Sequence, residues 1–185
     1  MTKPSAAVFA AMLVATLVAA SPVAGAVGRA NPVAVKQWTA SVCRDFDRWT
    51  AGLTTSDTPG ALADPASTKA AITKYLTRAI KTTNTLISDL KRAGVPAVTD
   101  GKPIAATFNS SARSLRKAFT RAKAKAAGLS TVDPAAFATG AQALLSQLQT
   151  AGAALETTLT RTAKRHPAAK LDKAFSTTTA CTAAA

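Results

Sequence analysis

The sequence predicts an all-α protein: an up-down four-helix bundle with a short fifth helix at the carboxyl end, after an amino-terminal signal segment. Three observations lead to this prediction. Apolar residues recur at steps of three and four along five segments, which is the spacing of one helix face. These segments lack the apolar–polar alternation that is typical of strands. Pro and Gly residues separate the segments at the places where helices ordinarily begin and end.

An export signal precedes the first predicted helix. Lys3 is followed by an apolar run over residues 6–20, and Pro22 then interrupts it. Ala24-Gly25-Ala26 supplies the small residues that a signal peptidase reads. We therefore expect cleavage after Ala26.

This cleavage divides the chain into a signal peptide over residues 1–26 and a single helical domain over residues 27–185. It predicts a protein that is secreted or associated with the cell envelope. Cleavage after Ala20 is an alternative, and so is retention of the whole segment as an uncleaved anchor.

The first helix is expected over about residues 32–52. Asn31 is a good N-cap residue, and Pro32 would occupy the first helical position. Gly52 marks the expected end.

The second and third helices are expected over about residues 65–93 and 103–127. Asp64 precedes Pro65 in the same capping arrangement as at the first helix. Gly94 and Gly128 stand where the two helices should stop.

The fourth helix is expected over about residues 134–165, with Asp133 as its N-cap, and the fifth over about residues 168–180. His166-Pro167 provides the break between them. Short connections between long helices favour antiparallel neighbours, and hence an up-down bundle.

The apolar stripes of the four long helices define the expected core. It comprises Trp38, Val42, Phe46, Trp49, Ile72, Leu76, Ile80, Leu90, Ile104, Phe108, Leu115, Phe119, Leu144, Leu148, Leu155 and Leu159.

The chain contains two cysteines, Cys43 near the start of the domain and Cys181 near its end. In an oxidising compartment such residues most simply pair with each other, so we expect a Cys43–Cys181 disulfide. Two separate buried thiols are the alternative.

Several functional classes find little support in the composition. One His and two distant Cys exclude a His/Cys zinc cluster and a CxxC redox motif. The nine Gly residues are scattered, so no phosphate-binding loop is indicated. Asp45 and Asp47 are two residues apart on a helix and do not face each other, and adjacent arginines suggest a solvated charged face. We therefore expect a non-enzymatic protein that has no metal site and no cofactor.

Positive charge is the strongest compositional signal, with 23 Lys and Arg against 9 Asp and Glu. It is densest in the third predicted helix, where helical geometry places four cations opposite the apolar stripe: Arg113, Arg116, Lys117 and Arg121. A solvated basic exterior is the simplest interpretation. Binding of a polyanion, such as a wall polymer or a nucleic acid, is the second, and attachment to anionic lipid is the third. Aromatic residues are not interleaved with these cations, so there is no specific nucleic-acid signal.

Two motifs carry a resemblance to a group of proteins. They are W-x4-C-x2-F-x2-W, which begins at Trp38, and A-F-x5-C, which ends at Cys181. With the signal segment, they make the chain resemble the small Ala/Thr-rich secreted helical proteins of high-GC Gram-positive bacteria. The resemblance implies export and a disulfide-tethered helical bundle, and it carries over no catalytic residue.

The sequence thus predicts a secreted, non-enzymatic helical protein that associates with the anionic cell envelope through a basic face. Its expected partner is an anionic wall polymer or an anionic lipid surface, and no protein partner is indicated. One alternative is an exported enzyme with a dispersed site that gathers Asp45 or Asp47 with His166. Another is a protein that binds polyanions or nucleic acids more generally.

Overall fold

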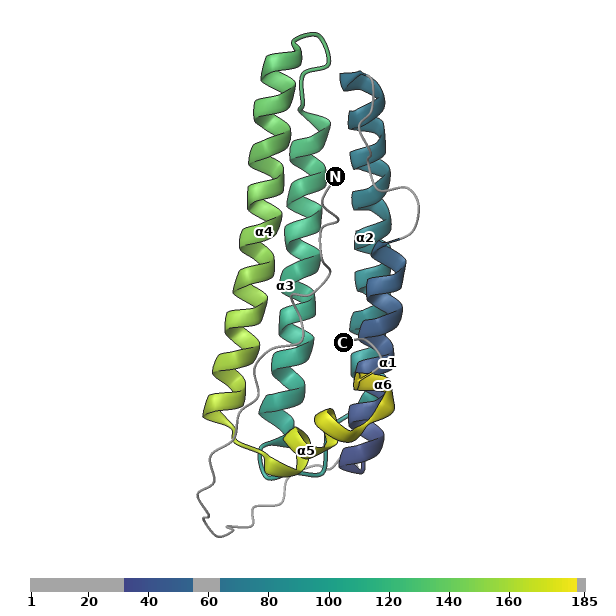
Figure 1. Cartoon of the computed structure of the whole chain (residues 1–185), viewed down its shortest axis with the longest axis vertical. Helices are drawn as coiled ribbons and strands as arrows, with labels where there is room; N and C mark the ends of the chain where they lie inside the picture. The colour runs from purple at the N-terminus through teal and green to yellow at the C-terminus, as the bar shows by residue number, and fades with distance from the viewer. Residues whose placement is uncertain (1–31, 55–63, 183–185) are drawn as a thin grey trace.

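The computed structural model describes residues 32–54 and 64–182, and these residues are almost entirely helical (Figure 1). The helices are α1 (Val35–Leu53), α2 (Pro65–Ala93), α3 (Gly101–Ala127), α4 (Pro134–Arg165), α5 (Ala169–Thr177) and α6 (Thr179–Thr182). Within these residues the only β-type pairing is an isolated bridge between Val33 and Pro96. The predicted all-α bundle with a short helical carboxyl end is confirmed. The predicted signal segment lies outside the described residues.

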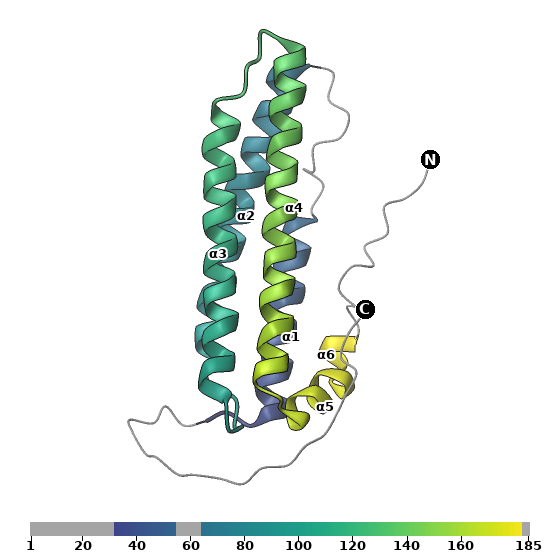
Figure 2. The ribbon, with the colours of Figure 1, turned by 90° about the vertical axis from the view of Figure 1, so that its left-hand side faces the viewer.

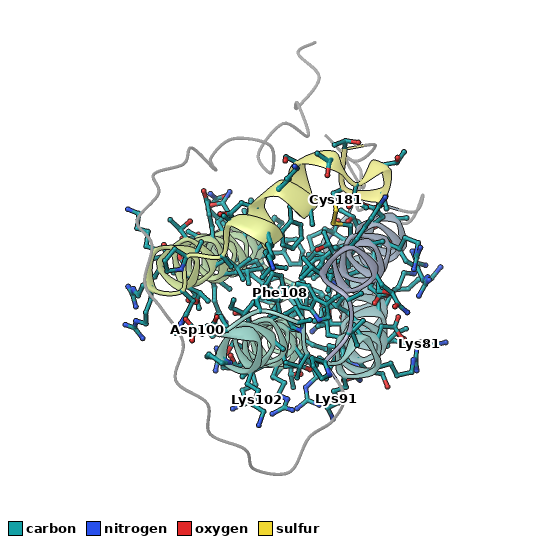
Figure 3. The ribbon with its side chains drawn as sticks, turned by 90° about the horizontal axis from the view of Figure 1, so that it is seen from below. Lys81, Lys91, Asp100, Lys102, Phe108 and Cys181 are labelled. Carbon is teal, nitrogen blue, oxygen red and sulfur yellow. A yellow bond between two sulfur atoms is a disulfide. The ribbon has the colours of Figure 1, made fainter. Side chains whose placement is uncertain are left out.

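The four long helices alternate in direction along the bundle axis (Figures 1 and 2). α2 packs against both α1 and α3, whereas α4 packs mainly against α3. α1 is the shortest of the four, and it lies beside the lower part of α2 but not beside its upper end (Figure 1). Seen from below, α5 and α6 run from the α4 side of the bundle to the α1 side (Figure 3). The carboxyl end therefore occupies a position that direct packing of α1 against α4 would otherwise fill.

Two of the predicted N-caps are present. The Asp64 side chain accepts a hydrogen bond from the backbone N–H of Ser67, and this bond lowers the pKa of the Asp64 carboxyl. Asp133 Oδ1 accepts from the backbone N–H groups of Ala135 and Ala136 at 2.9 and 3.1 Å. Each carboxylate satisfies amide donors that a helix start leaves without intrahelical partners.

The predicted start of the first helix is wrong by three residues. α1 begins at Val35, and its N-cap is Ala34. Val33 is held in an extended pairing instead, because its N–H donates to the Val95 carbonyl and its own carbonyl accepts from the Ala97 N–H, both at 2.8 Å. Non-local backbone hydrogen bonds thus override the local Pro signal. Asn31, the predicted cap, lies outside the described residues.

The predicted fifth helix is divided in two. Thr178 has an extended backbone with ψ of 119°, and it separates α5 from the four-residue α6. It stands in the middle of three consecutive threonines, whose branched side chains reduce helix propensity.

The lower part of the core is centred on Trp38, which is 2 % exposed. Its ring makes edge-on contacts with Phe108 of α3 and Phe175 of α5, with ring centroids 5.5 and 6.2 Å apart. Its Nε1 donates to the Gly94 carbonyl over 3.1 Å. Buried side chains of α1, α2, α3 and α5, including Leu171, complete this region.

The upper part of the core is formed by α2, α3 and α4. Leu76, Phe119 and Leu144 are buried there, together with small side chains such as Ala79 and Ala122. Alanines let these helices approach one another closely, and the core predicted from the sequence did not include them.

Half of the predicted core residues are buried, namely Trp38, Val42, Leu76, Leu90, Ile104, Leu115, Phe119 and Leu144. The other half are partly exposed: Phe46, Trp49, Ile72, Ile80, Phe108, Leu148, Leu155 and Leu159. The α4 residues of this second group are partly exposed because α4 has one main packing neighbour rather than two.

Candidate polyanion-binding face

The four cations predicted on the third helix lie on its outward side. Arg113, Lys117 and Arg121 are exposed, and Arg116 is half-buried. The opposite side of α3 is packed into the core. Successive positions four residues apart rise by about 6 Å along a helix, so these side chains form a short cationic stripe along α3. We call these four residues the α3 basic face.

Arg116 lies at the junction between α3 and α2. Its Nη1 donates to Oδ1 of Asn84 on α2 over 3.4 Å. This contact places Asn84 at the same level of the bundle as Arg116. The α3 basic face therefore borders directly on the surface of α2.

The basic character extends over both helices. α2 carries six Lys and Arg with one acid, and α3 carries seven with none. Viewed from below, Lys91 and Lys102 project outward from the bundle, whereas Phe108 lies toward its centre (Figure 3). The acid on α2 is Asp89.

Asp89 does not reach the surface as a free carboxylate. Its side chain is 4 % exposed, and Oδ2 accepts from Arg48 Nη1 of α1 over 2.9 Å. Its other oxygen contacts Arg92 of α2. The described surfaces of α2 and α3 therefore present cations without an exposed carboxylate among them.

Asp45 also lies beside the Arg48–Asp89 pair. This position corrects the expectation that Asp45 belongs to a solvated charged face on α1. Its side chain is 13 % exposed and lies 3.5 Å from Arg48 Nη1. Burial raises the pKa of the Asp45 carboxyl, and the nearby charge of Asp89 adds to the rise. Together with Lys81, these residues help to line a hollow of about 590 Å³ between α1 and α2.

His166 has a carboxylate partner that its sequence neighbours do not supply. Its Nδ1 lies 3.0 Å from Oδ2 of Asp100, which precedes α3. Asp45 lines the hollow between α1 and α2 together with Asp89, and His166 does not line that hollow. The dispersed site that would favour an exported enzyme gathers Asp45 or Asp47 with His166, and neither of these two is the carboxylate beside His166.

The two cysteines form the predicted bridge. Cys43 of α1 and Cys181 of α6 are bonded, with their Cα atoms 5.1 Å apart. The bond attaches the carboxyl end to α1 across 138 positions of sequence. Leu171 and Ala174, 4 % and 8 % exposed, anchor the same segment through burial.

Three residues that shape this region were not identified from the sequence: Asn84, Asp89 and Asp100. Each has a partner on another helix or connection, and such contacts leave no periodic trace in sequence. A local signal existed only for Asp89, whose spacing of three from Arg92 allows an ion pair on one helix.

The part of the chain that the structure describes contains no cluster of three or more His, Cys, Asp or Glu side chains that could hold a metal ion. No described helix is both long and apolar enough to cross a membrane. The chain matches no protein-family model, no curated protein and no solved structure.

Proposed function

We propose that this chain is a secreted, non-enzymatic helical protein that associates with the anionic cell envelope through the α3 basic face. The observation that carries the proposal is the separation of charge. Exposed cations cover α2 and α3, whereas the only acid of these two helices is buried and paired. A surface of one sign raises the local concentration of oppositely charged polymers and accelerates their association.

The bundle is a suitable support for such a face. The apolar sides of α2 and α3 are buried against each other and their neighbours, so the cations are held on rigid helices. Arg side chains pair with phosphate or carboxylate through two parallel hydrogen bonds, and Lys supplies additional charge.

The test is retention of the full exported protein on phosphocellulose and on isolated walls of the producing cells. Arg113→Gln, Arg116→Gln, Lys117→Gln and Arg121→Gln are combined in one variant, because Gln preserves helix propensity. We expect weaker retention and a smaller dependence of log affinity on log salt, since fewer counterions are released. Circular dichroism checks that the helix content is unchanged.

A matched control removes four exposed cations from α4 and the segment after it: Arg161→Gln, Lys164→Gln, Arg165→Gln and Lys170→Gln. This control has the same net charge as the α3 variant but an intact α3 basic face. Equal losses in both variants would mean that net charge alone causes retention. Retention of the α3 variant at the wild-type level would leave the basic surface as a solubility feature.

The export component has its own test. Sequencing the amino terminus of protein recovered from the medium and from the envelope fraction should locate cleavage after Ala26. An intact amino terminus found only in the membrane fraction would support the anchored alternative.

A further inference from the structure

The cations of α3 leave a gap that α2 fills. Between Lys102 and Arg113 there is no Lys or Arg on α3, which corresponds to about 16 Å along the helix. Arg116 contacts Asn84, and α2 and α3 are antiparallel, so residues after Asn84 lie beside residues before Arg116. Lys91 is therefore level with the part of α3 near Asn109, within the gap.

Lys91 is exposed and projects outward on the same side of the bundle as Lys102 (Figure 3), whereas Lys81 of α2 lines the hollow between α1 and α2. Combined with Lys102 and the α3 basic face, Lys91 forms a band of cations across two helices, which we call the α2–α3 track. Its span from Lys102 to Arg121 is about 28 Å, since each helical residue rises about 1.5 Å.

A lipid surface is a poor match for this track. Helices that lie on membranes bury an apolar side in the interface. The apolar side of α3 is occupied by the core, where Ile104 and Phe119 are each 6 % exposed. The exposed large apolar residues of the described chain are Val132 and Leu145, and neither belongs to α2 or α3.

Base stacking is also unsupported on the track. The aromatic residues of α3 are Phe108, which packs against Trp38, and Phe119, which is buried. Proteins that bind single-stranded nucleic acids combine a cationic groove with accessible aromatic platforms. The track offers charge alone, so its ligand is recognised through charge spacing.

We propose that the α2–α3 track binds a linear polyanion with closely spaced charges, of the polyphosphate class, laid lengthwise along the two helices. This inference rests on the proposed function and narrows its ligand from any anionic envelope component to an extended, charge-dense chain. The track is about 28 Å long, as estimated from helical rise. A short anion contacts only part of it, so the affinity should increase with the length of the polyanion.

The experiment measures binding of the full exported protein to fluorescent long-chain polyphosphate over a range of salt concentrations. Two variants are compared: Lys91→Gln with Lys102→Gln on the track, and Lys164→Gln with Lys170→Gln as the charge-matched control. The track variant should bind more weakly, and its salt slope should fall by about two, one for each cation removed. The control should keep the wild-type slope.

Competition separates the classes of ligand. Long-chain polyphosphate should displace the probe far better than tripolyphosphate does at equal phosphate concentration. Equal competition by the two would overturn the lengthwise track. Stronger binding to phosphatidylglycerol vesicles than to polyphosphate, with the same sensitivity to loss of Lys91 and Lys102, would assign the surface to lipid.

Failure of this inference and failure of the proposed function give different results. If the four-residue α3 variant no longer binds polyphosphate but the Lys91 and Lys102 variant behaves like its control, the site is confined to the α3 basic face and the proposed function stands. If the wild-type chain is retained by neither polyphosphate nor isolated walls, the proposed function itself fails.

Discussion

Arg48 on α1 donates a hydrogen bond to Asp89 on α2 across 2.9 Å, and the two residues of this pair are 41 positions apart in sequence. Asp89 is buried, whereas the Arg48 side chain is 62 % exposed. The pair therefore removes the only carboxylate of α2 from the surface while its cationic partner stays hydrated.

Adding an acid to the α3 basic face should reverse part of its effect. Thr120→Glu places a carboxylate among Arg116, Lys117 and Arg121, and Thr120 is exposed. We expect weaker retention on phosphocellulose and earlier elution in a salt gradient, because the new charge competes for the cations. Gln142→Glu on α4 is exposed, makes the same change in net charge, and should have a smaller effect. Identical elution of the two variants would contradict a localised face.

The disulfide should contribute strongly to stability. Replacing Cys43 and Cys181 with Ser opens a very long loop, for which chain entropy predicts a loss of up to about 5 kcal/mol. The free energy of unfolding is obtained from urea denaturation. In a Trp49→Phe background, Trp38 fluorescence also reports whether α5 still covers it. An unchanged urea midpoint would show that burial of Leu171 and Ala174 alone holds the carboxyl end.

Two leucines of α4 should differ in their energetic contribution. Leu144 is 5 % exposed and packs against α2 and α3, so Leu144→Ala should cost about 2–5 kcal/mol of unfolding free energy. Leu148 is only partly buried, and Leu148→Ala should cost less. Urea denaturation followed by circular dichroism gives both values. A larger loss at Leu148 would mean that α4 presents a different face to the bundle.

Asp45 should make stability depend on pH in an unusual direction. Its pKa in the folded chain is raised by burial and then by Asp89, above the unfolded value of about 3.9. From about pH 4 up to the raised pKa, the folded chain binds more protons at Asp45 than the unfolded chain does. Ionisation of this residue therefore lowers the free energy of unfolding as the pH rises through that window.

Asp45→Asn removes this contribution and keeps a similar side-chain shape. Compared with the wild type, the variant should lose less stability, or gain more, between about pH 4 and neutral pH. Urea midpoints measured at several pH values for both proteins give the difference. Parallel pH profiles would show that Asp45 titrates equally in the folded and unfolded chains.

Much of the helical architecture could be predicted because its signals are local. Asp64 and Asp133 cap their helices as expected, since a carboxylate one residue before Pro is positioned to meet the first free amides. The start of α1 could not be predicted in this way. Val33 pairs with Val95 and Ala97, and those hydrogen bonds exist only once α2 and α3 are in place.

The same distinction between local and non-local signals applies to the α3 basic face. Helical periodicity alone places Arg113, Lys117 and Arg121 on the side of α3 opposite its apolar stripe, and the structure exposes all three. The neighbour of that face could not be predicted. Contact of Arg116 with Asn84 depends on how the second and third helices are aligned, and no local spacing encodes that alignment.

The sequence by itself determined the four long helical segments, their amphipathic sides, the concentration of positive charge and the presence of one pair of cysteines, because each depends on nearest neighbours or on composition. Only the tertiary structure decided that α4 packs mainly against α3, that α5 and α6 cross to α1, and that Asp89 is enclosed by Arg48 and Arg92. These features depend on side-chain packing and ion pairing between segments far apart in the chain. The same apolar stripes could be buried in several alternative arrangements, and such contacts form only in the arrangement that the complete fold adopts.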